Sequence, residues 1–142
     1  MTDLEKKIRE QLEFCKTINC FRSAIYVSSK TKLKMVIDLL LKIMEELPEG
    51  FVTSCGFGIA SSNLVYKFTN GSLIKVVVAN DWSMGNKSNG CVIDEEITNE
   101  TKKAIVYPQL IPLITSNEKH EFESWNNIKE RVFEARIEND DL

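Results

Sequence analysis

The spacing of hydrophobic residues in the first part of the chain predicts an amphipathic helix. Apolar residues recur every three or four positions over residues 3–16, and Thr2 followed by Glu5 forms a capping box in front of them. These apolar residues are Leu4, Ile8, Leu12 and Cys15. The other face is charged, so we expect the helix to pack through one stripe, on its own domain or on a second copy of the chain.

A strand and a second helix are predicted to follow. The stretch AIYVS at residues 24–28 has the apolar and aromatic composition of a strand, and the next residues have helical length and composition. Ser28 or Ser29 can cap this helix, and Pro48 and Gly50 end it. Its apolar residues lie on more than one side, which predicts that the helix is covered on two sides.

The middle of the chain changes to the pattern of strands. Residues 51–59, 64–69 and 73–79 are rich in Val, Ile and Phe, and Asn70-Gly71 between the last two predicts a hairpin. A polar loop follows and leads to residues 91–94, an apolar run without alternation. Such a run is typical of a strand that is buried on both faces.

The last third of the chain predicts mostly helix. Thr98 can cap a short helical segment that ends before Pro108, and residues 110–115 are a candidate for a second buried strand. Asn117 can cap a final helix, and the acidic tail at residues 136–142 is expected to fray. The apolar residues of this predicted helix are Phe122, Trp125, Ile128, Val132 and Phe133.

Together these elements predict one α/β domain over residues 1–142, with a core at 22–135 and a three-layer arrangement. The sheet is expected to be mixed, with flanking helices and an antiparallel hairpin carrying the tripeptide NGS. The chain has the size of a single domain, and its 43% hydrophobic and 27% charged residues are near globular averages.

Net charge, hydropathy and cysteine content argue against several classes of protein. A net charge of −3 argues against a broad basic surface for nucleic acid, and no apolar run is long enough to cross a bilayer. The four cysteines lack CxxC spacing and there is one histidine, so we interpret the cysteines as reduced core residues and expect no zinc site. Without a secretory signal, the expected location is the cytoplasm.

Three adjacent carboxylates end the buried strand, at Asp94, Glu95 and Glu96. A carboxylate at a strand end can hold a hydrated Mg²⁺ ion, and its neighbour can accept a proton from water. The same residues can also be a solvated strand end that favours the start of a helix. The stretch AIYVSSKT at residues 24–31 has the spacing of a GxxxxGKT phosphate loop, but alanine and serine replace both glycines.

The order of these signals resembles the ATPase domain of the large terminase subunits of tailed phages, over roughly residues 22–135. The matching stretches are AIYVSSKTKLKMVIDLLLKIMEELP, LVYKFTNGSLIKVVVAN, SMGNKSNGCVIDEE and LIPLITSNEKHEFESWNNI. The resemblance implies that Asp94 supports a magnesium ion, that Glu95 activates the attacking water, and that Thr115 and Ser116 sense the γ-phosphate. Two features depart from the family: the phosphate loop is missing, and Lys87 lies where the family often has an arginine.

These observations favour function by binding over ATP hydrolysis. The chain is expected to be a small terminase-like phage protein that binds packaging machinery, nucleic acid or a host factor in the host cytoplasm. The alternative is a phage or mobile-element protein that binds or sequesters a nucleotide or another small ligand. Trp82 and Lys87 would then supply stacking and anion pairing, beside Lys30 and Thr31. A third possibility is an ATPase, with Mg²⁺ and ATP, that is completed by a second chain.

Overall fold

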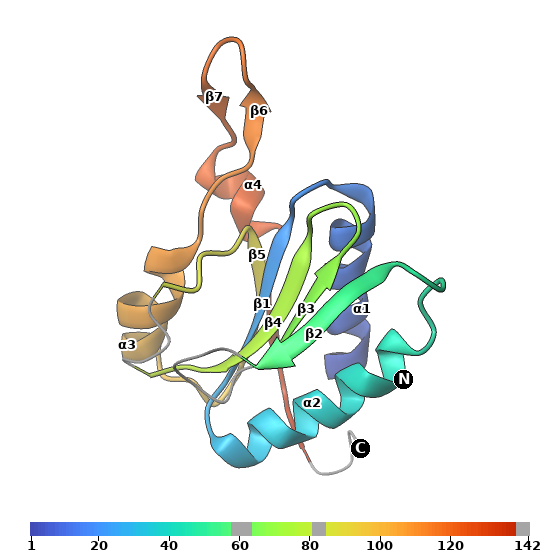
Figure 1. Cartoon of the computed structure of the whole chain (residues 1–142). Coiled ribbons are helices and arrows are strands. Elements are labelled where there is room, and N and C mark those ends of the chain that lie inside the picture. The colour runs from blue at the N-terminus through green and yellow to red at the C-terminus, as the bar shows by residue number, and fades with distance from the viewer. Residues whose placement is uncertain (58–63, 81–84, 139–142) are drawn as a thin grey trace.

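Six strands form one mixed sheet at the centre of the protein (Figure 1). In this computed structural model the described residues are 1–57, 64–80 and 85–138. The strands are β1 (Arg22–Val27), β2 (Val52–Phe57), β3 (Leu64–Phe68), β4 (Leu73–Val78), β5 (Gly90–Asp94) and β8 (Val132–Ala135), in the spatial order β2-β3-β4-β1-β5-β8. β1 is parallel to β4 and β5, β5 is parallel to β8, and β3 pairs antiparallel with β2 and β4. The predicted single α/β domain with a mixed sheet is therefore confirmed.

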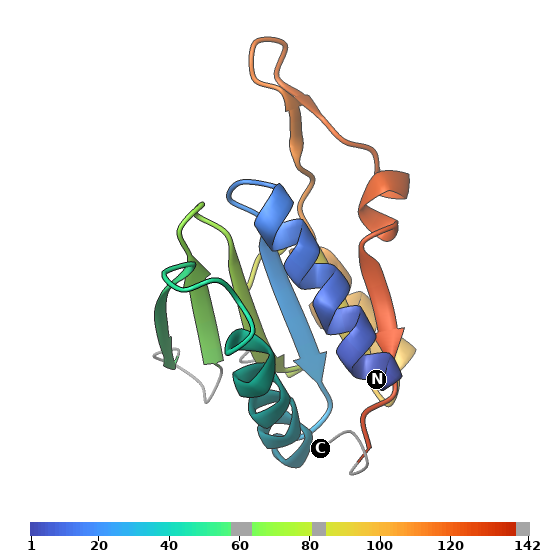
Figure 2. The same ribbon diagram turned by 90° about the vertical axis from the view of Figure 1, so that its right-hand side faces the viewer.

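Helices α1 (Asp3–Thr17) and α2 (Lys30–Met44) cover the same face of this sheet (Figure 2). The apolar stripe of α1 is buried together with one side of α2 and with Ile25 and Val27 of β1. Leu41, on the side of α2 that faces away from the sheet, is 48% exposed. The prediction that α2 is covered on two sides is therefore wrong. Because the α1 stripe packs on its own sheet, pairing of this stripe with a second copy stays a prediction.

The opposite face of the sheet is covered by the segment that follows β5. This segment contains α3 (Asn99–Thr101), the π-helical turn η2 (Lys102–Val106) and the 3-10 turn η3 (Tyr107–Gln109), as predicted for a short helical stretch. Ile97 and Val106 pack there against Tyr26 and Cys91. Cover on both faces explains why every residue of β5 is buried, as its unbroken apolar run predicts.

The predicted Asn-Gly turn joins β3 to β4. Gly71 has a φ of +82°, a left-handed conformation that glycine adopts without steric cost. The Asn70 side chain donates to the Cys15 carbonyl at 2.7 Å, and the Ser72 hydroxyl donates to the Ile18 carbonyl at 2.8 Å. These two bonds tie the hairpin turn to the end of α1. The predicted strand at residues 51–59 is observed as β2, and residues 58 and 59 lie outside the described part.

The C-terminal third differs from the prediction of a buried strand and a long helix. Residues 114–116 form β6 (Ile114–Ser116), which pairs with β7 (Glu121–Phe122) in a small, exposed hairpin. Only α4 (Trp125–Lys129) is helical, and the chain then enters the sheet as β8. The physical reason is that β5 is fully buried, so its outer backbone groups need partners, and β8 supplies them in parallel register.

A buried ion pair holds this C-terminal segment together. The guanidinium of Arg131 lies against Glu123, whose side chain is 6% exposed, with one of the two contacts at 3.0 Å. Arg131 Nε also donates to the Asn89 carbonyl at 3.1 Å, and its guanidinium lies 5.6 Å from the centre of the Phe21 ring. The Arg131 side chain therefore joins the amino end of β5 to the segment between β7 and α4.

Three other expectations can be compared with the structure. Cys15 and Cys91 are buried as predicted, whereas Cys20 and Cys55 are exposed, so the reading of all four as core residues is wrong. In the tail, Ile137 is buried in the core, and residues 139–142 lie outside the described part. None of the helices in the described part is long and apolar enough to cross a membrane.

Candidate functional site

The carboxyl ends of β1 and β5 form the place where an α/β sheet is expected to hold a ligand. These two strands are parallel neighbours. The chain leaves β1 toward the face covered by α2, and it leaves β5 toward the face covered by η2. Where adjacent connections diverge in this way, a crevice opens beyond the strand ends, and ligands of open α/β sheets bind there. We call the residues at this position, Ser28 to Lys32 and Asp94 to Glu96, the switch-point site.

Asp94 occupies the centre of the switch-point site and is fully buried. Its Oδ2 accepts hydrogen bonds from the backbone N–H of Ser28 at 2.9 Å and from the Ser28 hydroxyl at 2.6 Å. Its Oδ1 accepts from the ammonium of Lys32 at 3.1 Å and from the backbone N–H of Glu96 at 3.1 Å. Both oxygens of the carboxylate are thus engaged by protein donors, and its lone pairs are largely used.

Lys32 is the functional candidate that the sequence interpretation missed. Its ammonium also contacts Glu96 at 2.8 Å, so it bridges two of the three carboxylates. Burial alone would lower the pKa of Lys32, but the hydrogen bonds that its ammonium donates to Glu96 and Asp94, with the negative charge of both, outweigh burial and raise that pKa. Lysine at the third position of a helix that follows a strand end could have signalled this contact, because such a side chain can reach back over the helix start.

The phosphate loop that the spacing of residues 24–31 allowed is absent. β1 continues as regular strand to Val27, and Ser29 is extended, with φ −153° and ψ 163°. In the described part of the chain, positive φ outside glycine occurs only at Cys20 and His120. A phosphate-wrapping loop needs such angles, so this stretch cannot form one without rearrangement. Lys30 and Thr31 instead begin α2 and are exposed.

The other predicted site residues do not all meet here. Glu95 is exposed, and its carboxylate lies 3.8 Å from Arg136. Thr115 and Ser116 lie in the β6–β7 hairpin, which projects from the opposite end of the sheet, where β1 and β5 begin (Figure 1). The expectation that they gather with Asp94 is therefore wrong. Its reason is that Leu110 pairs beside Ser88, before β5 begins, so the following residues leave the sheet at that end.

Lys87 and Trp82 belong to the loop between β4 and β5. Lys87 is exposed, and its carbonyl oxygen accepts a hydrogen bond from Lys75 at 3.3 Å. Trp82 lies outside the described residues. Their predicted stacking and anion-pairing roles stay predictions.

The donor set at the switch-point site does not favour a metal. Asp94, the predicted magnesium ligand, already carries four hydrogen bonds, and Glu96 is paired with Lys32. Within the described ranges, no three His, Cys, Asp or Glu side chains come together in a group that could hold an ion. A hydrated Mg²⁺ ion would have to displace the Lys32 ammonium before it could reach Asp94.

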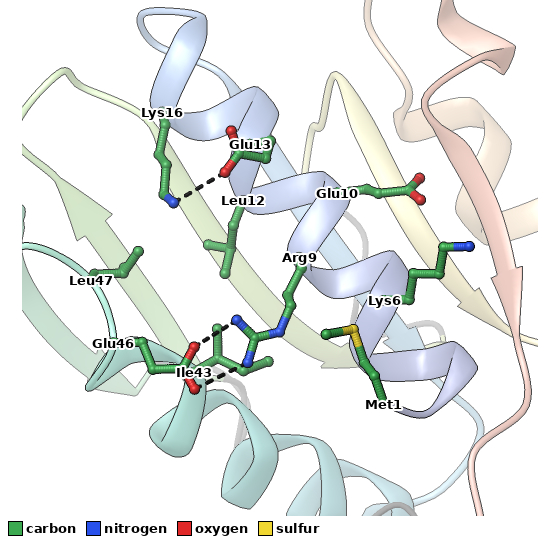
Figure 3. Close-up of a pocket in the computed structure, with 10 residues that line it drawn as sticks. All are labelled: Met1, Lys6, Arg9, Glu10, Leu12, Glu13, Lys16, Ile43, Glu46 and Leu47. Carbon is green, nitrogen blue, oxygen red and sulfur yellow. Dashed lines mark hydrogen bonds and ion pairs between the residues drawn. The ribbon is translucent and has the colours of Figure 1, made fainter.

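A second hollow lies between α1 and the end of α2 (Figure 3). Its volume is about 400 Å³, and its floor includes Leu12, Ile43 and Leu47. Four of the charges on its rim are paired: Arg9 contacts both oxygens of Glu46, at 2.6 and 3.2 Å, and Lys16 contacts Glu13 at 3.1 Å. The two remaining rim charges, Lys6 and Glu10, have opposite signs, so the hollow has no excess of one charge that would favour a charged ligand.

The charge state of Asp94 predicts how stability responds to acid. Burial opposes ionisation of Asp94, but hydrogen bonds from Ser28, Glu96 and Lys32 hold its pKa below the ordinary value. At pH near 4 the unfolded chain therefore binds more protons at this residue than the folded chain, and stability falls as the pH falls. We expect wild-type protein to lose more unfolding free energy between about pH 5 and pH 3 than Asp94→Asn, measured by urea titration. Equal losses would contradict this assignment.

Asp94, Glu96 and Lys32 thus form a closed polar cluster at a position where α/β sheets bind ligands, next to the exposed first turn of α2. That turn still has free backbone N–H groups at Lys30 and Thr31, because these residues have no intrahelical acceptor. Comparison of the chain with protein-family models, with curated proteins and with solved structures finds no match.

Proposed function

We propose that this protein acts by binding and not by hydrolysing ATP. The observation that carries the proposal is the Lys32 ammonium, which lies between Asp94 and Glu96 where a metal ion would have to bind. An ATPase uses such carboxylates to hold Mg²⁺ and to activate water. Here the acidic residues are used to fasten α2 to the end of β5, and the residues of the phosphate loop are missing.

The favoured ligand is a nucleotide or another small molecule that carries a phosphate group. A phosphate can approach the start of α2, where the helix dipole, two free N–H groups and the Lys30 side chain all favour negative charge. Glu95 lies exposed at the neighbouring strand end and can accept hydrogen bonds from the hydroxyl groups of a sugar. Binding of this kind needs no metal, since the positive charges come from the protein.

A thermal-shift series tests this function. Nucleoside mono-, di- and triphosphates and cyclic nucleotides are compared, each in Mg²⁺ and in EDTA. A ligand at a hundred times its dissociation constant stabilises a fold by about 2.7 kcal/mol, which is a shift of several degrees. We expect at least one nucleotide to give the same shift with and without Mg²⁺, and Lys30→Gln to reduce that shift. Lys34→Gln, farther along the same helix, is the matched control.

One result would contradict the proposal, and another would change the kind of ligand. A shift that requires Mg²⁺, together with release of phosphate, would favour the ATPase, in which Glu95 activates water. A complete absence of shifts would exclude binding of a nucleotide. It would leave binding of a macromolecule as the second candidate.

This second candidate is a terminase-like protein that binds packaging machinery, nucleic acid or a host factor. The order of elements supports it, because β1 with α2, the β3–β4 hairpin, and β5, which ends at Asp94 and is followed by Glu95, have the order of the terminase ATPase domain. Large apolar side chains at the far end of the protein also support it: Ile114, Phe122 and Trp125 are 57%, 59% and 44% exposed. Exposed groups of this kind often mark contacts between proteins.

A further inference from the structure

A groove lies at the opposite end of the sheet from the switch-point site. It has a volume of about 500 Å³ and separates the turn after α1 from the chain that leads into β6. One wall is apolar and includes Ile111, Leu113 and Ile114, of which Ile114 is 57% exposed. The other wall is polar and includes Arg22, at the start of β1. A ligand in this groove would therefore meet an apolar surface on one side and a cation on the other.

The backbone holds Arg22 firmly at the groove. Asn89 accepts a hydrogen bond from the Arg22 N–H at 2.9 Å, and the Asn89 N–H donates to the Arg22 carbonyl at 2.7 Å. The guanidinium itself has no hydrogen bond or carboxylate partner among the residues that the structure describes. Guanidinium groups match carboxylates and phosphates with two parallel hydrogen bonds, so an exposed, unpaired arginine whose backbone is held at a groove is a ready anion contact.

A second cation, Lys75, lies on the strand next to Arg22: its register partner on β1 is Ala24, two residues after Arg22. Lys75 of β4 is 8% exposed, and within the described ranges its ammonium contacts only the carbonyl oxygen of Lys87, at 3.3 Å. Burial, followed by repulsion from Arg22, lowers the pKa of Lys75 to about 8. Buried charges in proteins are normally paired with an opposite charge. Two neighbouring cations without a carboxylate therefore leave a local excess of positive charge that an anion would relieve.

We propose that this groove binds a small organic anion, a carboxylate or phosphate monoester on an apolar body, with Arg22 contacting the anionic group. The apolar body lies along Ile111, Leu113 and Ile114. This site is separate from the switch-point site, and it goes beyond the proposed nucleotide binding.

Cys20 provides a direct reporter of binding. Cys20 is an exposed residue that lines the groove, with its Sγ 3.9 Å from the Asn70 carbonyl oxygen, whereas the exposed Cys55 lies on β2 at the far edge of the sheet. Cys15 and Cys91 are buried, and burial raises the pKa of each thiol to about 12, so both react slowly. The alkylation rates of Cys20 and Cys55 by iodoacetamide can therefore be measured by peptide mass spectrometry in the same sample.

The probes share one apolar body and differ in the head group: 4-phenylbutyrate, 4-phenylbutyl phosphate and the neutral 4-phenylbutanol. At about five times its dissociation constant, a bound probe slows alkylation of Cys20 about sixfold, while the rate at Cys55 is unchanged. We expect this protection from at least one anion and not from the alcohol. The stronger of the two anions identifies the head group that the groove prefers.

Variants of Arg22 test whether this residue binds the anionic group of the probe. Arg22→Gln should abolish the protection, Arg22→Lys should retain part of it, and Arg136→Gln, an exposed arginine near the other end of the sheet, should leave it intact. Slow alkylation of Cys15 and Cys91 in each variant verifies that it is folded. The proposal is overturned if neither anion protects Cys20, if the alcohol protects it equally, or if protection survives in folded Arg22→Gln.

Discussion

Replacing Asp94 with alanine is expected to lower the free energy of unfolding by about 3 kcal/mol, the cost of breaking a buried, charged hydrogen-bond cluster. The substitution leaves the Ser28 N–H and the Glu96 N–H without their acceptor, and it removes one of the two carboxylates that neutralise Lys32. In a domain of this size the change corresponds to a fall of roughly 10 °C in melting temperature. Urea unfolding at pH 7 gives the free energy directly.

Glu95→Ala is the matched control, because it removes the neighbouring carboxylate of the same acidic motif. Glu95 is exposed, and its contact with Arg136 is a surface ion pair at 3.8 Å. Such pairs contribute about 0 to 1 kcal/mol, so stability should hardly change. If the two variants were equally stable, Asp94 would not be the structural residue that its contacts indicate, and a role in binding a metal would regain support.

The elements predicted from local pattern agree with the structure where local chemistry decides the backbone. The Thr2 cap of α1 and the Asn70-Gly71 turn depend on residues within a few positions of each other, and both are observed. The unbroken apolar run of β5 likewise predicted burial on both faces. The fold class then followed from the order of these elements.

The C-terminal third could not be predicted in the same way, because distant partners decide its conformation. Val132 and Phe133 fit the apolar face of a helix equally well, yet they form a strand beside Cys91 and Val92. The strand is favoured because the backbone groups along the outer edge of β5, about forty residues earlier in the chain, would otherwise be buried without hydrogen-bond partners. A periodic pattern within one segment does not contain this information.

In the candidate site, too, local sequence predicted some features, and contacts between distant residues decided the others. Asp94 does lie at the end of a buried strand, as predicted, whereas its role as a magnesium ligand stays a prediction and its neighbours were not foreseen. Lys32 reaches it only because β1 and β5, distant in sequence, lie side by side. The same topology carries Thr115 to the other end of the sheet, away from the acids. Whether the resemblance to the terminase ATPase reflects common function stays a prediction that the nucleotide series tests.

The ion pair between Glu123 and Arg131 is the second place where one side chain should have a large effect. The two side chains are 6% and 10% exposed. Burial opposes ionisation of Glu123, but the hydrogen bonds from Arg131 and from the Leu113 N–H, together with the charge of Arg131, lower the pKa of the carboxyl group. Glu123→Ala leaves the Arg131 guanidinium buried without a carboxylate. We expect a loss of about 3 to 5 kcal/mol of unfolding free energy, as for other buried pairs broken on one side.

Glu121→Ala, two residues earlier and exposed, serves as the control and should cost little. The double variant Glu123→Ala with Arg131→Met distinguishes the charge from the packing. If the unpaired charge causes the loss, removing it as well should restore much of the stability, because methionine fills apolar space beside Phe21. If the double variant is less stable than Glu123→Ala, Arg131 acts mainly through its bonds to the Asn89 and Asn127 carbonyls, and the ion pair is secondary.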